Sequence, residues 1–271
     1  MRKVLTKSRF KNGRRLLYPV GALLVAALVY AGFFHVAEPD PEVLLASAEV
    51  YAHSGLYEEA KEIAFQVLKE KPDSVDARLI LGLVAERTGD LDAALGIYEK
   101  LKREVDGATK RRRLELSCID LERRLQRFES AKARVAASRE AGDKNPQLER
   151  ILGVIAFDEG HTTVAIRHFE SYLTMVPESE EAKSLLIQAQ LSNGQTSKAR
   201  DLLSRVDEKS QTCWPLWPRL ARTCLEAGDE EGALAALSRY AELDAHAQNR
   251  LRQNEYWRSR VESGEFSEIF N

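Results

Sequence analysis

Cysteine is scarce in this sequence, which excludes a protein held together by disulfide bonds. The 271 residues contain only three cysteines, and no two of them have the CxxC spacing. An odd, widely spaced set does not form a disulfide framework. We expect Cys118 and Cys224, on predicted packing faces of helices, to be buried. Cys213 precedes Trp214 in a predicted loop, and we expect it to be the accessible thiol.

Motifs that carry catalysis are also missing. The sequence has no GxxxxGK[S/T] phosphate loop, no GxSxG elbow, no HExxH zinc pair and no EF-hand loop. His161 and His168, the closest of five scattered histidines, straddle a predicted turn and are not expected to bind a metal. We therefore expect no enzyme, no cofactor, no metal and no small-molecule substrate. An undetected envelope enzyme is the less favoured alternative.

Long apolar runs are absent except at one place, and charge is unevenly distributed. The chain is 44% hydrophobic and 30% charged, which excludes a disordered tail, a collagen-like rod and a polytopic membrane protein. The first fifteen residues hold seven Lys and Arg and no acid, although the whole chain has a net charge of −2. The remainder is therefore acidic.

The single apolar run predicts a transmembrane helix. Residues 16–34 carry no charge, and a helix of that length matches a hydrocarbon layer of about 30 Å. We expect a basic cytoplasmic tail at 1–15, a transmembrane signal-anchor helix at 16–36 and a linker at 37–40. The positive flank places the N-terminus in the cytoplasm and the rest in the periplasm, at a bacterial inner membrane. A cleaved signal peptide is the competing interpretation.

Beyond the linker, the sequence repeats with a period of about 34 residues. Glycines recur at this spacing, and an alanine follows each glycine by five residues. A weaker copy around Phe128 and Ala131 has no glycine at its turn. Each copy predicts two amphipathic helices around a tight turn, with the alanine at the helix crossing and a larger apolar residue four places later in the interhelix core. The repeats are expected at 41–74, 75–108, 109–145, 146–179, 180–213 and 214–247.

This pattern closely resembles the tetratricopeptide repeat (TPR) family. The residues that match the family pattern are Leu81-Gly82, Gly89, Ala94, Tyr98, Leu152-Gly153, Gly160, Ala165, Phe169, Pro177, Trp217, Leu220, Gly228 and Ala233. The resemblance implies an all-α fold, a right-handed superhelix of about six helix pairs over 41–247, preceded by the transmembrane helix. Residues 248–271 are expected to form a C-terminal capping helix in which Tyr256 and Trp257 pack back on the last pair.

The resemblance also implies a partner-binding groove lined by the first helix of each pair. Several of the corresponding positions are apolar, and we expect an apolar peptide or helix of a partner protein to bind there. Packing between neighbouring first helices is an equally weighted explanation. The candidate groove residues are Leu79, Ile80, Leu83, Leu116, Ile151, Val154, Phe157, Leu185 and Leu191.

Six arginines form a candidate basic patch in the third repeat: Arg111, Arg112, Arg113, Arg123, Arg124 and Arg127. They predict a site for an acidic protein or anionic lipid, whereas a solvated helix face with pairs such as Asp120 to Arg123 is the favoured alternative. No nucleic acid is expected. The sequence therefore predicts a membrane-tethered scaffold in envelope assembly, secretion or respiratory-complex biogenesis. A cytosol-facing receptor of opposite topology is the alternative.

Overall fold

The computed structural model describes residues 40–206, 210 and 212–270. The predicted tail, the membrane helix and most of the linker fall at 1–39 and lie outside the described residues. Among the helices that the structure does describe, none combines the length and the apolar character needed to cross a membrane.

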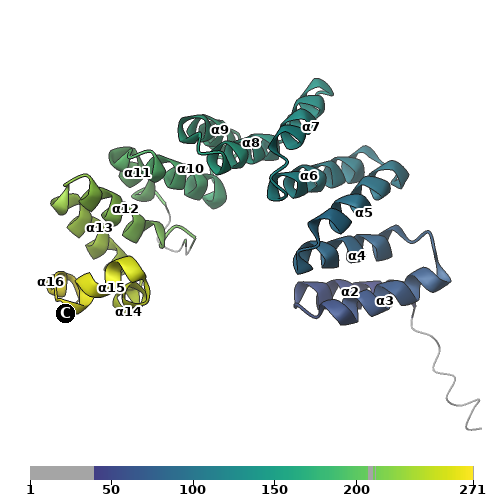
Figure 1. Ribbon diagram of the computed structural model, residues 1–271, viewed down its shortest axis with the longest axis horizontal. Helices are drawn as coiled ribbons and strands as arrows, with labels where there is room; N and C mark the ends of the chain where they lie inside the picture. Colours follow the sequence, from purple (N-terminus) through teal and green to yellow (C-terminus); the bar gives the residue numbers. More distant parts are fainter. Residues whose placement is uncertain (1–39, 207–209, 211, 271) are drawn as a thin grey trace, which may run out of the picture. The chain divides into compact units, whose positions relative to one another are not determined.

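Every regular element of the described part is an α-helix, which confirms the all-α prediction. Figure 1 shows the helices following one another in chain order. Their bounds are α2 Pro41–His53, α3 Tyr57–Glu70, α4 Val75–Thr88, α5 Leu91–Glu104, α6 Ala108–Arg124, α7 Phe128–Glu140, α8 Pro146–Asp158, α9 Thr162–Met175, α10 Glu180–Ser192, α11 Thr196–Leu203, α12 Leu216–Glu226, α13 Glu230–Leu243, α14 Ala247–Gln253, α15 Glu255–Glu262 and α16 Ser267–Phe270.

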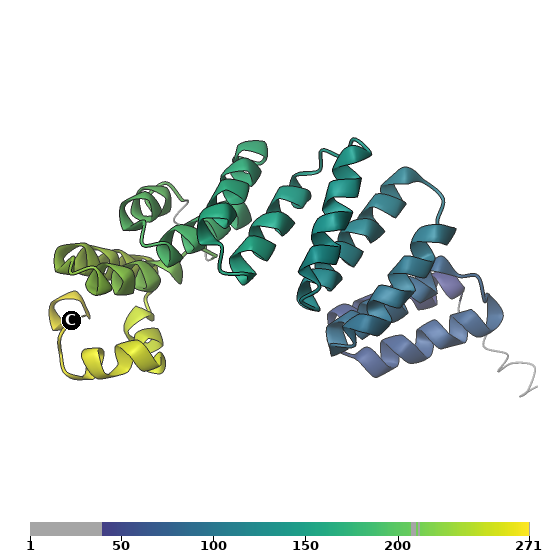
Figure 2. The same ribbon diagram turned by 45° about the horizontal axis from the view of Figure 1, so that its top comes forward.

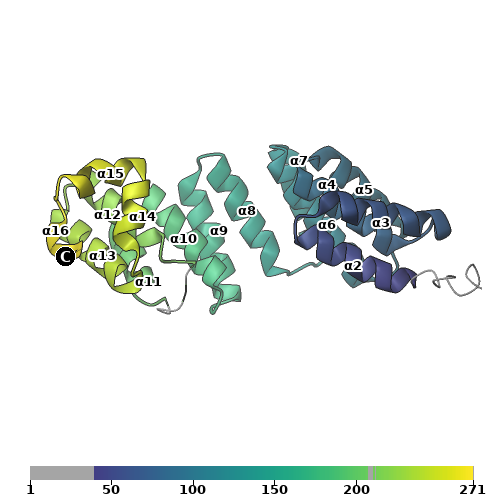
Figure 3. The ribbon, with the colours of Figure 1, turned by 90° about the horizontal axis from the view of Figure 1, so that it is seen from below.

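The helices fall into two compact units that meet in sequence between Gly89 and Asp90. In the first unit, α3 packs against both α2 and α4, as Figure 3 shows. In the second unit, α5 packs against α6, and the pairs α6–α7, α8–α9, α10–α11 and α12–α13 follow. The boundary falls inside the predicted repeat 75–108, so α4 and α5 belong to different units.

The turn inside a helix pair closes in the same way several times along the chain. Gly160, Gly194 and Gly228 have φ angles of 80°, 70° and 77°. The N–H of the residue after each glycine then donates to the carbonyl five residues back, at distances of 2.8 Å. This is a Schellman closure, in which a left-handed residue satisfies carbonyls that the helix end leaves free. The recurring glycine is thus explained by backbone geometry.

In the third pair, Gln126 takes the place of the glycine. Among the described residues it is the one non-glycine with a positive φ, at 59°. Its neighbour Arg127 donates its N–H to the carbonyl of Glu122 at 2.8 Å, as in the other turns. Gln126 also precedes Ala131 by five residues, the spacing of glycine and alanine in the other repeats. The third pair therefore keeps the turn at the expense of a strained residue.

The interhelix core has the predicted composition. The six alanines that follow the turns are fully buried: Ala60, Ala94, Ala131, Ala165, Ala199 and Ala233. Four residues later, Phe169, Leu203 and Leu237 are buried as well. Gly153 on α8 faces Phe169 on α9, where an added Cβ would lie 2.5 Å from the ring. In pairs that pack within one unit, such as α8 and α9, small residues are required because the helices cross too closely for larger ones.

The C-terminal end is three short helices instead of the single capping helix that we predicted. Asn254 ends α14 and caps α15 by accepting the N–H of Tyr256 at 3.0 Å, and Gly264 has a φ of 80°. Figure 2 shows these helices, in yellow, beside α12 and α13. Trp257 is buried in one cluster with Leu220 and Leu237, and Tyr256 packs against that cluster. This confirms that both aromatic residues pack on the preceding pair.

The strained turn makes a stability prediction. A Gln126→Gly variant should unfold with a free energy about 1 kcal/mol higher than the wild type, because glycine adopts a positive φ without the clash that a Cβ brings. Urea unfolding followed by circular dichroism measures the difference. Gln126→Ala, which keeps the Cβ, is the control and should bring no gain. An equal gain in both variants would contradict the explanation.

Candidate functional site

Three of the nine predicted groove residues are core residues. Ile80 on α4, Ile151 on α8 and Leu191 on α10 are 6%, 1% and 5% exposed. Ile80 packs in the core of α2, α3 and α4, whereas Ile151 packs with Leu148 and Val135. These three side chains are therefore corrected from groove to core. The reason is that these three side chains lie on faces that their helices bury against other helices of the same unit.

The other predicted residues are half-buried and keep an exposed edge. In the first unit these are Leu79 and Leu83 on α4. In the second unit the half-buried side chains form an apolar row, which we define as Leu116, Val154, Phe157 and Leu185. Val154, Phe157 and Leu185 all pack against one core cluster of α8, α9 and α10, and Leu116 packs against the neighbouring cluster.

Arginines connect successive first helices of the second unit beside this row. Arg123 on α6 donates to Asp158 on α8 at 2.9 Å. Arg150 on α8 lies 3.7 Å from a carboxylate oxygen of Glu181 on α10. Each junction between these helices thus carries one arginine bridge.

The α10–α12 junction follows the same rule. Arg219 on α12 donates to the side-chain oxygen of Gln188 on α10 at 3.3 Å. The bridging residues Arg150, Gln188 and Arg219 were not predicted, because only apolar residues were considered as groove candidates. Arg150 lies four residues before Val154 and Gln188 lies three residues after Leu185, so each shares a helix face with a predicted groove residue. This spacing was the signal that could have found them.

Two open pockets are lined in part by Arg123 and by Arg219. One is lined by Arg123, Arg124 and Asp158 together with Leu91, Gln126 and Phe128. The other lies between α10 and α12 and is lined by Leu191, Ser192, Arg219, Arg222, Thr223 and Glu226. Arg222 also lies over the ring of Tyr256, 4.5 Å from its centroid. The surface of the second unit therefore combines exposed apolar edges with fixed guanidinium groups, a combination suited to binding a peptide.

The predicted basic patch is not one patch. Arg111, Arg112 and Arg113 lie in the first turns of α6, whereas Arg123 and Arg124 lie in its last turn, about 18 Å away at 1.5 Å per residue. Arg112 pairs with Asp143 at 3.0 Å, and Arg127 pairs with Asp92 at 2.8 Å.

Arg123 completes this set of ion pairs. It pairs with Asp120 at 3.1 Å, which is the pair that the alternative interpretation named, and it also bridges to Asp158. The prediction of one basic patch is therefore corrected: the arginines form two separate clusters, one at each end of α6.

A cluster of charged side chains joins α5, α6 and α7. Arg134 donates to Glu122 at 2.9 Å and to Glu115 at 3.2 Å, and it also pairs with Glu99. Lys102 pairs with Glu99 at 3.3 Å and with Glu115. Glu122 is buried, and its second carboxylate oxygen has no hydrogen-bond partner among the described residues. The cluster lies between packed helices, so we interpret it as structural.

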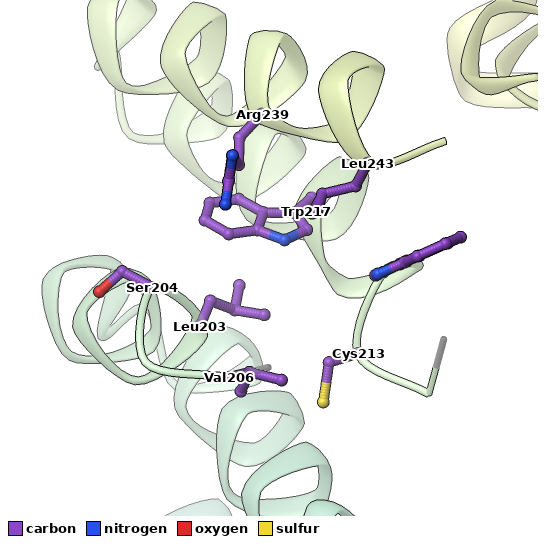
Figure 4. Close-up of a pocket in the computed structure, with 8 residues that line it drawn as sticks. Leu203, Ser204, Val206, Cys213, Trp217, Arg239 and Leu243 are labelled. Atoms are coloured by element: carbon purple, nitrogen blue, oxygen red, sulfur yellow. The ribbon is translucent and has the colours of Figure 1, made fainter. Parts of the chain in front are cut away.

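All three thiols are buried, which corrects the prediction for Cys213. Cys118 and Cys224 are fully buried, as predicted, and Cys213 is only 1% exposed. Figure 4 shows Cys213 beside Val206 and Leu203, with Trp217 and Leu243 across a small pocket. Its position in a loop did not predict burial because this loop packs onto the ends of α11 and α13. Burial raises the pKa of Cys213, and it raises that of Cys118 to about 12.

Histidines and acids do not gather into a metal site in the part of the chain that the structure describes. His168 pairs with Glu149 at 2.9 Å, and His161 is exposed at the N-terminal end of α9.

Family models identify the repeat. Two models of the tetratricopeptide repeat match residues 45–109 and 156–218. The chain contains tetratricopeptide repeats. Residues 110–155, between the two matches, include α7 and the TPR turn at which Gln126 replaces glycine. TPR proteins bind other proteins or peptides and are generally scaffolds without catalytic activity.

Solved structures of TPR proteins have a similar fold. The Cut9–Hcn1 hetero-tetramer of the APC/C aligns over 96% of this chain with a TM-score of 0.60 at 17% identity, and the chain spans 46% of that protein. A TPR protein from Parabacteroides merdae has a TM-score of 0.59 at 16% identity, covering 83% of this chain and 88% of its own.

A third structure, pilF of Pseudomonas aeruginosa, has a TM-score of 0.56 at 16% identity and covers 79% of this chain and 97% of its own. Likeness at these identities shows the fold alone. None of the curated proteins compared with the chain matches it.

The charged cluster predicts how stability depends on pH. Partial burial acts to raise the pKa of Glu99, but Arg134 and Lys102 outweigh it and hold that pKa below its usual value of 4.5. The stabilisation that ionised Glu99 contributes to the fold is therefore complete above pH 4.5, and it is lost as the pH falls through the lowered pKa of this carboxyl group. Between pH 7 and pH 3, the wild type should lose roughly 0.5 kcal/mol more stability than Glu99→Gln, measured by urea unfolding. Equal losses would show that Glu99 contributes nothing.

Proposed function

We propose that the chain is a membrane-tethered scaffold that binds partner proteins or peptides through the first helices of its TPR pairs. The apolar row with its arginine bridges carries this proposal. Leu116, Val154 and Phe157 leave exposed apolar edges next to guanidinium groups that are already held in place, so a bound segment would cover apolar area without ordering those side chains first. The ligand that fits is a segment with apolar residues and acceptor groups.

The tether is proposed from the sequence of residues 16–34 and from the positive charge that precedes it. A single span would hold the repeats at the periplasmic face of a bacterial inner membrane, where a high local concentration compensates for modest affinity. Envelope assembly, secretion or respiratory-complex biogenesis are the processes that such a scaffold would serve. The alternative is a cytosol-facing receptor of opposite topology.

Binding by the apolar row is tested with Phe157→Glu combined with Leu185→Glu. A photo-crosslinking amino acid at Gln188 in the full chain should capture partners in cells, and the double variant should reduce the captured amount about tenfold, because charge replaces apolar contact area. Met175→Glu, an exposed position on α9, is the control and should leave capture unchanged. Unchanged capture in the double variant, with unchanged helical content, would rule out this surface.

Topology is tested with single added cysteines at Ser8 and Ser263. Ser263 is exposed at the end of α15, and the three native thiols are buried and should not react. In intact bacteria, a membrane-impermeant maleimide should label Ser263→Cys only, and after lysis it should label Ser8→Cys as well. Labelling of Ser8→Cys alone in intact cells would reverse the topology and favour the cytosol-facing alternative.

A further inference from the structure

An apolar band on α2 is left uncovered within the first unit. Val43, Val50 and Tyr51 are 59%, 61% and 37% exposed, and their spacing of seven and eight residues puts them on one helix face. The face that carries Ala48 and Ala52 is buried against α3 and α4. We define the α2 stripe as Val43, Ala46, Ser47, Val50 and Tyr51.

Exposed apolar side chains concentrate at the N-terminal end of the described residues. Among the described residues, seven large apolar side chains are exposed, and five of them belong to α2, α3 and the turn between them. The C-terminal end differs, because α14, α15 and α16 close it with a buried aromatic cluster. An apolar helix face of this kind is expected to be covered by a partner.

The shape of the stripe fits another helix. Glu42 and the five residues of the α2 stripe form one continuous, widely open face of this helix. The small Ala46 and Ser47 separate the larger Val43 and Val50, so a ridge of side chains from a second helix can enter between them. The α2 helix has 13 residues, so the contact extends over about 20 Å at 1.5 Å per residue.

The negative charge beside the α2 stripe indicates which kind of partner would bind there. Asp40, Glu42 and Glu49 are exposed beside it, and the sequence contains no Lys or Arg between Arg15 and Lys61. A second copy of the chain would bring these acids against one another, and an anionic membrane surface would repel them. A partner that carries positive charge beside its apolar ridge is attracted instead.

We infer that the α2 stripe docks an amphipathic helix of a partner protein whose apolar ridge is flanked by Lys or Arg. This site is separate from the apolar row of the second unit and does not depend on the proposed groove. The contact of one helix face is smaller than the roughly 800 Å² per partner of a standard interface, so binding is weak and sensitive to salt.

The test uses the full chain in nanodiscs of a zwitterionic lipid and a fluorescent helical peptide. The peptide has about 14 residues, to match the length of α2, with a Leu and Ala ridge flanked by Lys. A matched peptide carries Glu instead of Lys, and empty nanodiscs correct for binding to lipid. By fluorescence anisotropy, the Lys peptide should bind about tenfold more tightly than the Glu peptide, and this preference should shrink as salt is added.

Two double variants separate the apolar and the charged contributions. Val43→Glu with Val50→Glu should weaken binding of the Lys peptide about tenfold, because the apolar contact is lost. Glu42→Lys with Glu49→Lys should reverse the preference between the two peptides. All four positions are exposed, so circular dichroism should show unchanged helical content. Leu234→Glu, an exposed apolar position on α13, is the matched control and should bind as the wild type does.

Several outcomes would overturn the inference. Equal binding of the two peptides, or full binding by the Val43 and Val50 variant, would show that the stripe is not the site. Binding accounted for by empty nanodiscs would assign the effect to lipid. If analytical sedimentation shows that the wild type is a dimer and that Val43→Glu with Val50→Glu is a monomer, the stripe binds a second copy of the chain instead. Because Phe157→Glu with Leu185→Glu leaves α2 unchanged, failure of the groove proposal would be seen separately.

Discussion

The close crossing of two helices at a fully buried alanine is the contact on which the rest of this structure depends. The crossing needs a small side chain and a turn tight enough to reverse the chain within a few residues. Gly160 and Ala165 meet both needs in the fourth repeat, and Gly153 removes a Cβ where Phe169 must fit. Because these needs involve few positions, the remaining surface positions are free to vary in chemistry from pair to pair.

The turn of the third pair shows which part of the motif is indispensable. Gln126 accepts a left-handed φ, although glycine would adopt it at lower cost, whereas the alanine five residues later is kept and is fully buried. Helix crossing cannot tolerate a larger side chain without separating the helices, but a strained turn costs only on the order of 1 kcal/mol. Packing is therefore the stricter constraint, and the alanine is a more reliable marker of this repeat than the glycine.

Sequence reasoning predicted the helices well because the repeat supplies the same signal several times. It predicted the groove less well, because the spacing of apolar residues on a first helix does not show which face its neighbours cover. Ile151 and Phe157 are both apolar residues of α8, yet Ile151 is buried and Phe157 keeps an exposed edge. Cys213 was assigned wrongly for a related reason, since a loop position says nothing about what packs onto the loop. The arginines were overestimated as a patch because the net charge of a segment ignores carboxylates 35 residues away in the sequence, such as Asp158 for Arg123 and Asp92 for Arg127.

Because the alanine contact constrains few positions, the surface residues of the two units can differ in chemistry. In the second unit, arginine bridges such as Arg123 to Asp158 join successive first helices, so the same side chains that stabilise the stack also present donors at its surface. In the first unit, α2 carries an apolar stripe with the exposed acids Asp40, Glu42 and Glu49 beside it. An arginine already held by one carboxylate can donate to a second acceptor without much loss of side-chain entropy. Exposed valines gain free energy only when another apolar surface covers them. The two proposed sites would therefore take different ligands: segments with acceptor groups on the second unit, and a basic helix with an apolar ridge on α2.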